Sequence, residues 1–365
     1  MKNKIYNIII VWAWPSWLFC ASKISDSDSV LILDKNDSPA KKLLMSAKWR
    51  WNITNININP NTDYITDNQK FVVNSFEQYW VNEFIWFLNK EWIDIKEENN
   101  WRILLKSNKV SEFHQKLIQI VVNKWIKIEY NVTINNISKA EHNLFKIYTS
   151  IWEFKSKKVI IATWWPSFPN LGATWIAIDI AKSFNLNTTT YYPALVWFET
   201  NQDFSPLSWS SVIWKLSLFF RKNIIYEEEW PILFTHRWIS WPSVFNASLF
   251  LRDRTLSDYK IKLKISSHDI TKRLVHFLNF NSNNIKEYII STNIINVRWL
   301  EEAKVCWWWV KTNNLNSNFE CKQIKWLYFI WECIDVTGKT GWFNLQWCRT
   351  SAAICANWIN SNLEL

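Results

Sequence analysis

Glycine is nearly absent from this chain. Only 3 of its 365 residues are glycine, whereas average usage of about 7% would give roughly 26. Tryptophan departs in the opposite direction, with 29 residues, and the two types together come close to their usual combined number. The sequence therefore indicates that most glycine is written as tryptophan, as happens when UGA encodes glycine but is translated as tryptophan. On this interpretation tryptophan should stand where the backbone requires glycine.

Cysteine and histidine are also scarce, and neither forms a recognisable ligand set. The 6 cysteines show no C-x-x-C spacing, and the 5 histidines show no paired ligand spacing, so we expect no metal site. A chain of this length needs no disulfide framework, and a reducing compartment suits its free cysteines. We therefore expect a cytoplasmic protein.

Long apolar runs are lacking as well. Residues 8–21 are apolar and follow a basic start, as in a signal peptide, but this run is too short to cross a bilayer. We expect no stable membrane insertion. The net charge of +10 permits nucleic-acid binding, yet the lysines are dispersed and their longest cluster, residues 155–158, is short. We therefore expect a small-molecule substrate and no nucleic-acid partner; the sequence leaves the oligomeric state open.

The N-terminal segment has a strand–turn–helix pattern. Residues 6–11 form a β-branched run typical of a buried parallel strand, residues 18–23 favour a helix, and residues 30–33 form a second strand. Between the first strand and the helix stands W-A-W-P-S-W, which becomes G-A-G-P-S-G when tryptophan is read as glycine. This is the dinucleotide fingerprint, whose glycines allow a tight turn, approach to a pyrophosphate and close helix packing.

An acidic residue after the second strand completes that fingerprint, because it can accept hydrogen bonds from ribose hydroxyls. We therefore expect Trp12, Trp14, Trp17 and Asp34 to bind a dinucleotide. Two alternatives stay open. The apolar run could be a signal peptide, and Asp34 could be a solvated residue at a strand end.

Residues 41–55 carry a more specific motif. They read K-K-L-L-M-S-A-K-W-R-W-N-I-T-N, which resembles K-L-L-x-S-G-x-G-R-C-N-x-T-N, the signature of the BaiN-like family of FAD-dependent oxidoreductases. Ala47 stands at a family glycine, and Trp51 stands where the family usually has cysteine. The resemblance implies that FAD is lined by Lys42, Ser46, Arg50, Asn52 and Thr54. Without the resemblance, the segment would be interpreted as a polar loop.

The resemblance extends along almost the whole chain. Residues 162–175 follow the family's A-T-G-G-x-S-x-P-x-x-G-(S/A)-T-G, with Gly172 at a family glycine. Residues 331–346 follow its G-E-x-x-D-x-x-G-x-x-G-G-Y-N-L-Q, with Gly338 and Gly341 in place. The resemblance implies further FAD contacts at Val132, Trp164, Trp165, Trp331, Glu332, Asp335, Trp342, Phe343, Asn344 and Leu345.

Residues 233–242 read L-F-T-H-R-W-I-S-W-P, which is near identical to the family's L-F-T-H-x-G-x-S-G-P. The family brings this loop near the flavin, so the resemblance implies that His236 and Arg237 are catalytic residues on the substrate side. A structural loop pair is an equally simple interpretation. Recoding need not include every tryptophan, and Trp80 and Trp347 are candidates for genuine ones.

These observations predict an α/β protein with a discontinuous Rossmann-like FAD-binding domain. It would comprise residues 1–187 and 300–365, around an inserted, mainly β substrate domain with some helix at residues 188–299. The expected reaction passes hydride from NAD(P)H through FAD to an unidentified small molecule, of which an unsaturated carbonyl compound is one candidate. Alternatives are a flavin electron carrier or redox sensor, an amine oxidase-type flavoenzyme, and a literally tryptophan-rich surface binder without flavin.

Overall fold

The computed structural model describes residues 4–11, 15–25, 29–38, 52–163, 174–189, 192–251, 255–266, 272–278, 287–297, 303–307 and 309–362. The chain divides into two compact units. The first is discontinuous and consists of Met1–Thr189 and Trp308–Leu365, and the second is the continuous segment Thr190–Trp307.

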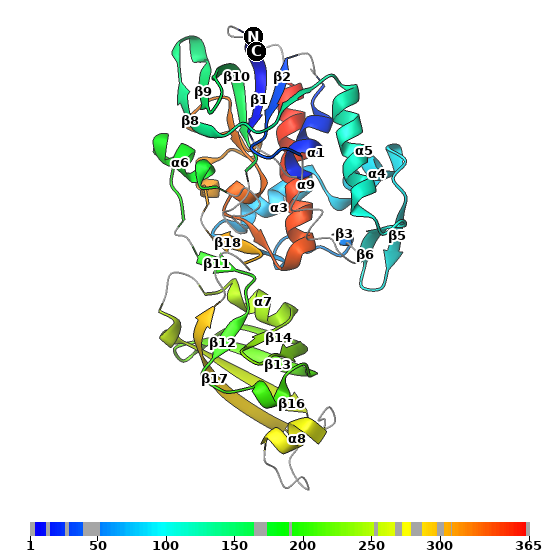
Figure 1. The fold of residues 1–365 in the computed structure, drawn as a ribbon, viewed down its shortest axis with the longest axis vertical. Coiled ribbons are helices and arrows are strands. Elements are labelled where there is room, and N and C mark those ends of the chain that lie inside the picture. The colour runs from blue at the N-terminus through cyan, green and yellow to red at the C-terminus, as the bar shows by residue number, and fades with distance from the viewer. Residues whose placement is uncertain are drawn as a thin grey trace. The chain divides into compact units, whose positions relative to one another are not determined.

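The first unit contains a parallel sheet of the Rossmann type (Figure 1). Its parallel strands are β1 (Ile5–Val11), β2 (Val30–Leu33), β7 (Lys127–Glu129), β10 (Glu153–Ile161) and β19 (Leu327–Phe329). Their spatial order is β7-β2-β1-β10-β19, which corresponds to the order 3-2-1-4-5 of the classic dinucleotide-binding sheet. The strands are apolar and β-branched because helices or loops cover both faces of such a sheet.

Strand β10 has two different partners along its length. Its first half pairs antiparallel with β9 (Phe145–Thr149), which continues into β8 (Ile134–Lys139), and its second half pairs in parallel with β19. The first half is partly exposed, whereas the residues from Lys158 to Ile161 are buried. Only the second half has the apolar run of a buried strand.

Helices from both ends of the chain cover this sheet. Helix α1 (Pro15–Lys23) packs against α9 (Thr340–Asn360) and α5 (Val110–Asn123). An isolated nine-residue helix is unstable in water, so α1 depends on this packing. Among the described residues, the unit also contains the α-helices α3 (Gln69–Gln78), α4 (Val81–Lys90) and α6 (Ile176–Ser183). A small sheet adds β3 (Asn52–Asn55), β6 (Arg102–Leu105) and β5 (Ile95–Glu98), and β4 (Tyr64–Ile65) pairs with β20 (Thr337–Gly338).

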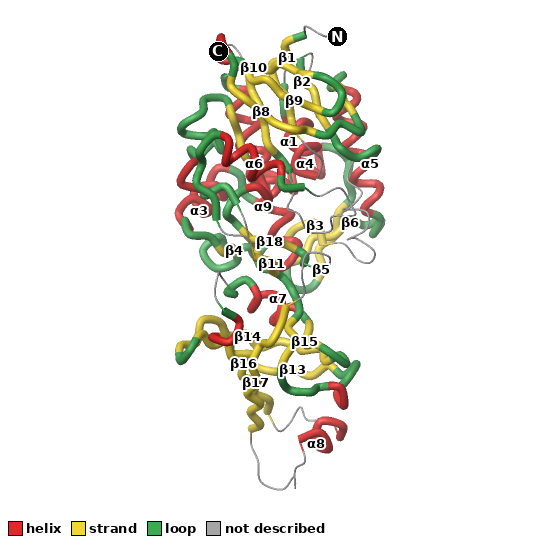
Figure 2. The backbone as a smooth tube through the Cα atoms, turned by 60° about the vertical axis from the view of Figure 1, so that its left-hand side comes forward, coloured by secondary structure: helices red, strands yellow, loops and turns green. Residues whose placement is uncertain are grey.

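The second unit is mainly β (Figure 2). Its closed barrel has the order β12 (Phe198–Thr200), β15 (Trp238–Ser240), β14 (Asn223–Phe234), β13 (Ser211–Phe220), β16 (Tyr259–Ser266) and β17 (Glu287–Val297). The helices α7 (Pro242–Ser248) and α8 (Lys272–Leu278) belong to this unit, as does the pair β11 (Tyr192–Ala194) and β18 (Val305–Trp307). An additional β domain is therefore present.

Two helices of the first unit are followed by tryptophan in the left-handed backbone conformation. Trp92 follows α4 with φ 57°, and Trp125 follows α5 with φ 60°. Asn185 follows α6 with φ 56°. In all three cases the next residue donates its N–H to the last turn of the helix, at 2.9 to 3.4 Å. This is the Schellman arrangement, whose left-handed position is usually glycine and sometimes asparagine.

Positive φ recurs at other tryptophans. The described tryptophans with positive φ are Trp92, Trp101, Trp125, Trp209, Trp241, Trp326 and Trp331. Bulky residues rarely adopt this conformation. The most extreme case is Trp241, which precedes α7 at φ 110° and ψ 167°, in a region that essentially only glycine populates. The backbone at these positions therefore has a conformation characteristic of glycine.

Candidate functional site

Four parallel strands end in one row at the same edge of the sheet. Val11 of β1 is in register with Leu33 of β2 and with Ile161 of β10, and Ile161 is in register with Phe329 of β19. The segments that follow these four strands therefore begin side by side. Ligands of open α/β sheets bind at this carboxyl edge, and it is the candidate site.

Seven of the predicted cofactor-binding residues fall outside the described residues. These are Trp12, Trp14, Lys42, Ser46, Arg50, Trp164 and Trp165. The remaining predicted residues are described, and the structure shows what their side chains and backbone contact.

Asp34 and Val132 adjoin each other at the end of β2. The Asp34 carbonyl accepts the Val132 N–H at 2.9 Å, and the Asp34 N–H donates to Glu129 O at 2.8 Å. The Asp34 side chain is fully buried, and its Oδ1 accepts the Asn36 N–H at 2.9 Å. A buried carboxylate needs hydrogen-bond donors, and ribose hydroxyls supply such donors. Strand β7 ends at Glu129, and Asn131 turns the chain with φ 59°.

The segment after β19 places two more carboxylates at the same edge. Trp331, at φ 62°, donates its N–H to Ser351 Oγ of α9 at 3.1 Å. Glu332 and Asp335 follow, and both side chains are buried. The buried hydroxyls of Thr163, which follows β10, and Thr337, in β20, have no hydrogen-bond partner among the described residues. Because buried polar atoms are normally hydrogen-bonded, these hydroxyls fit a polar ligand at the strand ends.

The turn from β20 into α9 is tightly built. A Cβ at Gly338 would lie 2.5 Å from the Cβ of Phe343, so only glycine fits, whereas a Cβ at Gly341 would meet nothing within 4 Å. The Asn344 side chain accepts the Gly338 N–H and donates to the carbonyls of Gly338 and Thr340, all at 2.9 Å. Its amide therefore holds the turn together, and its predicted contact with the cofactor stays a prediction. The start of α9 carries the other predicted contacts, of which Leu345 is buried and Trp342 and Phe343 are partly buried.

Helix α9 and β3 are joined by a buried polar network that links Thr54, a predicted FAD-lining residue, to Gln346, Thr350 and Arg349, for which the sequence predicted no role. Thr54 donates its hydroxyl to Gln346 Oε1 at 2.7 Å, and the Gln346 amide donates to Thr350 Oγ1 at 3.2 Å. Arg349 donates to Ile53 O at 2.6 Å. A glutamine and an arginine three residues apart in a helix of small and apolar residues were the available signal, since they share one helix face.

Aromatic rings surround the buried arginine of this network. The guanidinium of Arg349 lies 4.1 Å from the ring centre of Phe84 and 5.8 Å from that of Phe113. Burial lowers the pKa of Arg349 to about 10, so the group is still a cation at neutral pH. The network therefore fixes the N-I-T-N segment of β3 against the helix that begins at the strand edge.

The cysteines near the site are buried, and their environment favours the neutral thiol. The Cys333 thiol donates to Ile161 O at 3.2 Å and to Ile330 O at 2.9 Å, between the ends of β10 and β19. Burial raises the pKa values of Cys333 and Cys348. Because the thiolate is the reactive form, these thiols act as packing groups.

The two predicted catalytic residues belong to the second unit. His236 and Arg237 are exposed in the turn before β15. The Thr235 hydroxyl fixes this turn by accepting the N–H groups of Arg237 (3.4 Å) and Trp238 (3.0 Å) and by donating to Trp238 O (2.8 Å). The turn therefore presents both side chains to solvent on a defined backbone.

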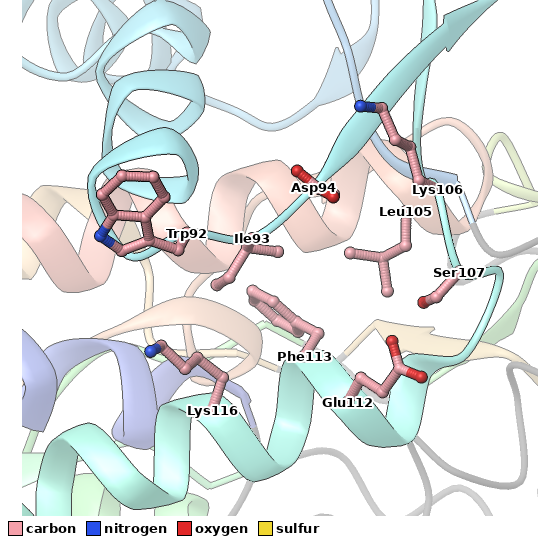
Figure 3. Close-up of a pocket in the computed structure, with 9 residues that line it drawn as sticks. All are labelled: Trp92, Ile93, Asp94, Leu105, Lys106, Ser107, Glu112, Phe113 and Lys116. Atoms are coloured by element: carbon pink, nitrogen blue, oxygen red, sulfur yellow. The ribbon is translucent and has the colours of Figure 1, made fainter.

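A pocket of about 280 Å³ lies between α5, β6 and the end of α4 (Figure 3). It is lined by Trp92, Ile93, Asp94, Leu105, Lys106, Ser107, Glu112, Phe113 and Lys116. Its charged lining residues are mostly exposed, and none belongs to the motifs described above. Trp92, at the left-handed position after α4, forms part of its rim.

Comparison with known proteins supports the same fold. A family model described as "HI0933-like protein Rossmann domain" matches residues 6–358. The chain is 27% identical to the ribosomal RNA dihydrouridine synthase of Escherichia coli K12, over 96% of this chain and 97% of that protein. It is 25% identical to the protein of the same name from Haemophilus influenzae, over 95% and 97%. The structure of a 3-ketosteroid-Δ4-(5α)-dehydrogenase from Rhodococcus jostii is similar with a TM-score of 0.54 and 8% identity, over 98% of both chains.

Proposed function

Because the chain belongs to the HI0933-like Rossmann family, we propose that it is an FAD-dependent oxidoreductase that takes its electrons from NAD(P)H. The observation that carries the proposal is the row of strand ends at Val11, Leu33, Ile161 and Phe329. Buried carboxylates and hydroxyls follow these ends, as a site for a dinucleotide with ribose and phosphate groups requires.

Specific residues would hold the cofactor. Asp34 is suited to the ribose hydroxyls, the start of α1 to the phosphates, and the turn from Gly338 into α9 to the ring end. Bound FAD would accept and deliver the hydride. The chain's own contribution is to bury the site, to hold β3 and α9 together through Gln346 and Arg349, and to orient the cofactor.

Purification of the native protein tests this assignment directly. We expect bound flavin in its absorption spectrum, FAD in the released fraction, and anaerobic bleaching on addition of NADH or NADPH. A protein that carries no flavin and does not bind added FAD would overturn the assignment. Bleaching without any substrate turnover would instead favour the electron-carrier alternative.

We propose further that the substrate is a uracil base of ribosomal RNA. The two curated relatives are named ribosomal RNA dihydrouridine synthases, and the chain spans nearly their whole length. The C5–C6 double bond of uracil is conjugated with the C4 carbonyl, so it is an unsaturated carbonyl group of the kind expected from the sequence. This proposal replaces the expected free small molecule with a base in RNA, and it makes nucleic acid a partner in the cytoplasm.

Reduction of this bond adds a hydride to one carbon and a proton to the other, while NAD(P)H is oxidised. His236 is a candidate proton donor, and the Arg237 cation suits a phosphate of the RNA. The test is to incubate unmodified ribosomal RNA with the native protein and NAD(P)H and to measure dihydrouridine by mass spectrometry. We expect dihydrouridine that depends on both protein and cofactor; its absence, with the flavin fully reducible, would refute the substrate.

We also propose that glycine stands in the native protein at most positions written as tryptophan. The support is the left-handed backbone at Trp92, Trp125 and Trp331 and the glycine-only conformation at Trp241. In addition, the buried indole N–H groups of Trp17 and Trp342 have no partner among the described residues, which costs about 1–3 kcal/mol for each group.

Peptide mass spectrometry of the native protein across residues 8–23 and 88–94 tests this proposal. We expect glycine at positions 12, 14, 17 and 92. Tryptophan at all four positions would refute the recoding and would leave an indole at each turn of the dinucleotide motif.

A further inference from the structure

We propose that the outer face of strand β16 binds the sugar–phosphate backbone of RNA. The face consists of Lys260, Lys262 and Lys264, which we call the lysine strip. The proposal rests on the proposed RNA substrate and adds to it a place where the polyanion is held.

The strip follows from the alternation of β16. Tyr259, Ile261, Leu263 and Ile265 point into the barrel and are at most 1% exposed. The intervening lysines point outward; Lys260 and Lys262 are exposed and Lys264 is half-buried. Alternate residues of a strand lie about 6.8 Å apart. The strand therefore presents a straight row of ammonium groups on a rigid support, as a groove that tracks a nucleic-acid backbone requires.

The neighbouring strand extends the positive charge. Lys215 of β13 pairs directly with Lys264 of β16 in the sheet register. Like charges directly opposite each other destabilise a sheet, and a bound polyanion would reduce this repulsion. Two acidic residues of β14 offset part of it, because Glu227 forms an ion pair with Lys215 at 3.1 Å and Glu229 stands directly opposite Lys215 in the register.

The other neighbour contributes little opposing charge. On β17 the residues opposite Lys264, Lys262 and Lys260 are Ile289, Ser291 and Asn293, which are uncharged and exposed. The acidic residue of β17, Glu287, pairs with Ser266 at the end of the strand. The strip is therefore bordered by hydrogen-bonding and apolar groups on this side.

An aromatic side chain lies beside the lysines. Phe219 of β13 is half-buried and pairs with Lys260 in register, and the Lys262 ammonium is 5.4 Å from the centre of its ring. Single-stranded nucleic acid is bound by positive charge next to aromatic rings on which bases stack. The lysines together with Phe219 therefore favour RNA as the ligand over small inorganic anions, which need positive charge alone.

The test compares two variants with the same loss of charge. The strip variant is Lys260→Gln/Lys262→Gln/Lys264→Gln, and the control variant is Lys70→Gln/Lys106→Gln/Lys157→Gln, whose lysines are exposed in the first unit. Affinity for unmodified ribosomal RNA is measured over a salt series, and circular dichroism verifies the fold of both variants. For single-stranded or duplex contacts, each phosphate contact contributes about 0.7 to 0.9 to the slope of log affinity against log salt.

We expect the strip variant to lower the steepness of this slope by about 2 to 3, while the control keeps the native slope. Equal slopes for the two variants would refute the proposal that the lysine strip binds RNA. Loss of binding to anionic phospholipid vesicles, with RNA binding intact, would also overturn it by making a membrane surface the partner.

The test separates the strip from the proposed substrate. If the native protein forms dihydrouridine in ribosomal RNA and the strip variant does so with unchanged affinity, the strip is wrong and the substrate stands. If the native protein neither binds nor modifies ribosomal RNA, both proposals fall. Bleaching of the flavin by NAD(P)H should be the same in all three proteins, because the strip lies outside the unit with the strand-end site.

Discussion

Exchanging tryptophan for glycine after helix α4 should stabilise the protein. In the left-handed conformation of position 92, a side chain with a Cβ costs about 1–2 kcal/mol. Trp92 is 91% exposed, so packing of its indole stabilises the folded chain very little. Glycine would lose part of the gain through about 0.5–1 kcal/mol of unfolded-chain entropy. We therefore expect Trp92→Gly to raise the free energy of unfolding by about 1 kcal/mol.

The same exchange inside the same helix supplies the control. Trp86 is 60% exposed in the interior of α4, and the Lys90 ammonium lies 5.2 Å from its ring centre. Glycine there loses about 0.5 kcal/mol of helix propensity and about 0.5 kcal/mol of cation–π interaction. Trp86→Gly should therefore lower the free energy of unfolding by about 1 kcal/mol.

Urea denaturation measures the free energy of unfolding of the two variants, which should change in opposite directions. Asn185→Gly after α6 is a third point, and it should change stability by less than Trp92→Gly because asparagine tolerates this conformation. If Trp92→Gly destabilised the chain as much as Trp86→Gly does, the backbone argument for recoded glycine would be refuted.

Three further changes probe the site and the core. Gly338→Ala should weaken FAD binding and lower the free energy of unfolding, because the new Cβ would lie 2.5 Å from Phe343 Cβ, whereas Gly341→Ala should change both quantities little. Titration with flavin compares the FAD affinities of the two variants. Equal losses of affinity would contradict the close approach at Gly338. Gln346→Leu should lower the free energy of unfolding by about 1–3 kcal/mol, because the buried Thr54 hydroxyl loses its acceptor, and it should also weaken FAD binding. Gln346→Glu keeps an acceptor and should recover part of the FAD affinity. A loss of stability with unchanged FAD affinity would show that the network does not position the cofactor. Burial lowers the pKa of His114 from 6.5 to about 4. As the pH falls, the imidazole is therefore protonated in the unfolded chain before it is protonated in the folded chain. The free energy of unfolding should fall by on the order of 3 kcal/mol from pH 6.5 to pH 4. Denaturation of His114→Leu should show a shallower fall, and an identical pH profile would exclude His114 as its source.

The sequence predicted best those strands and helices whose position is determined by a local pattern of apolar residues. The strands expected over residues 6–11 and 30–33 are β1, Ile5–Val11, and β2, Val30–Leu33, and the helix expected over residues 18–23 lies within α1, Pro15–Lys23. All three are set by a continuous apolar run or an amphipathic period, which local sequence contains. The Rossmann-type fold was predicted on the same basis, with the resemblance supplying the loops.

The buried network could not be predicted in this way. Thr54 and Gln346 are 292 residues apart in the chain, and nothing in either local pattern specifies the other as its partner. The role of Asn344 was also not evident, because a motif shows that an amide is present but not whether it binds the chain or a ligand. The end of β7 depends on Asn131 in the left-handed conformation, a choice that asparagine permits but does not require.

The pairing of β10 with β19 has a consequence for synthesis on the ribosome. The first half of the chain emerges with β1, β2, β7 and β10, but the fifth parallel strand and the helix that covers α1 come from the last forty residues. Unit Thr190–Trp307 is continuous and leaves the ribosome before them, so it can complete its barrel while the first unit still lacks its closing strand. Long-range pairing of this kind is slow and exposes apolar surface. The nascent first unit therefore has α1 packed against α5 but not against α9 until residues 327–360 are synthesised, and a chain that stops before them lacks both the fifth parallel strand and this covering helix.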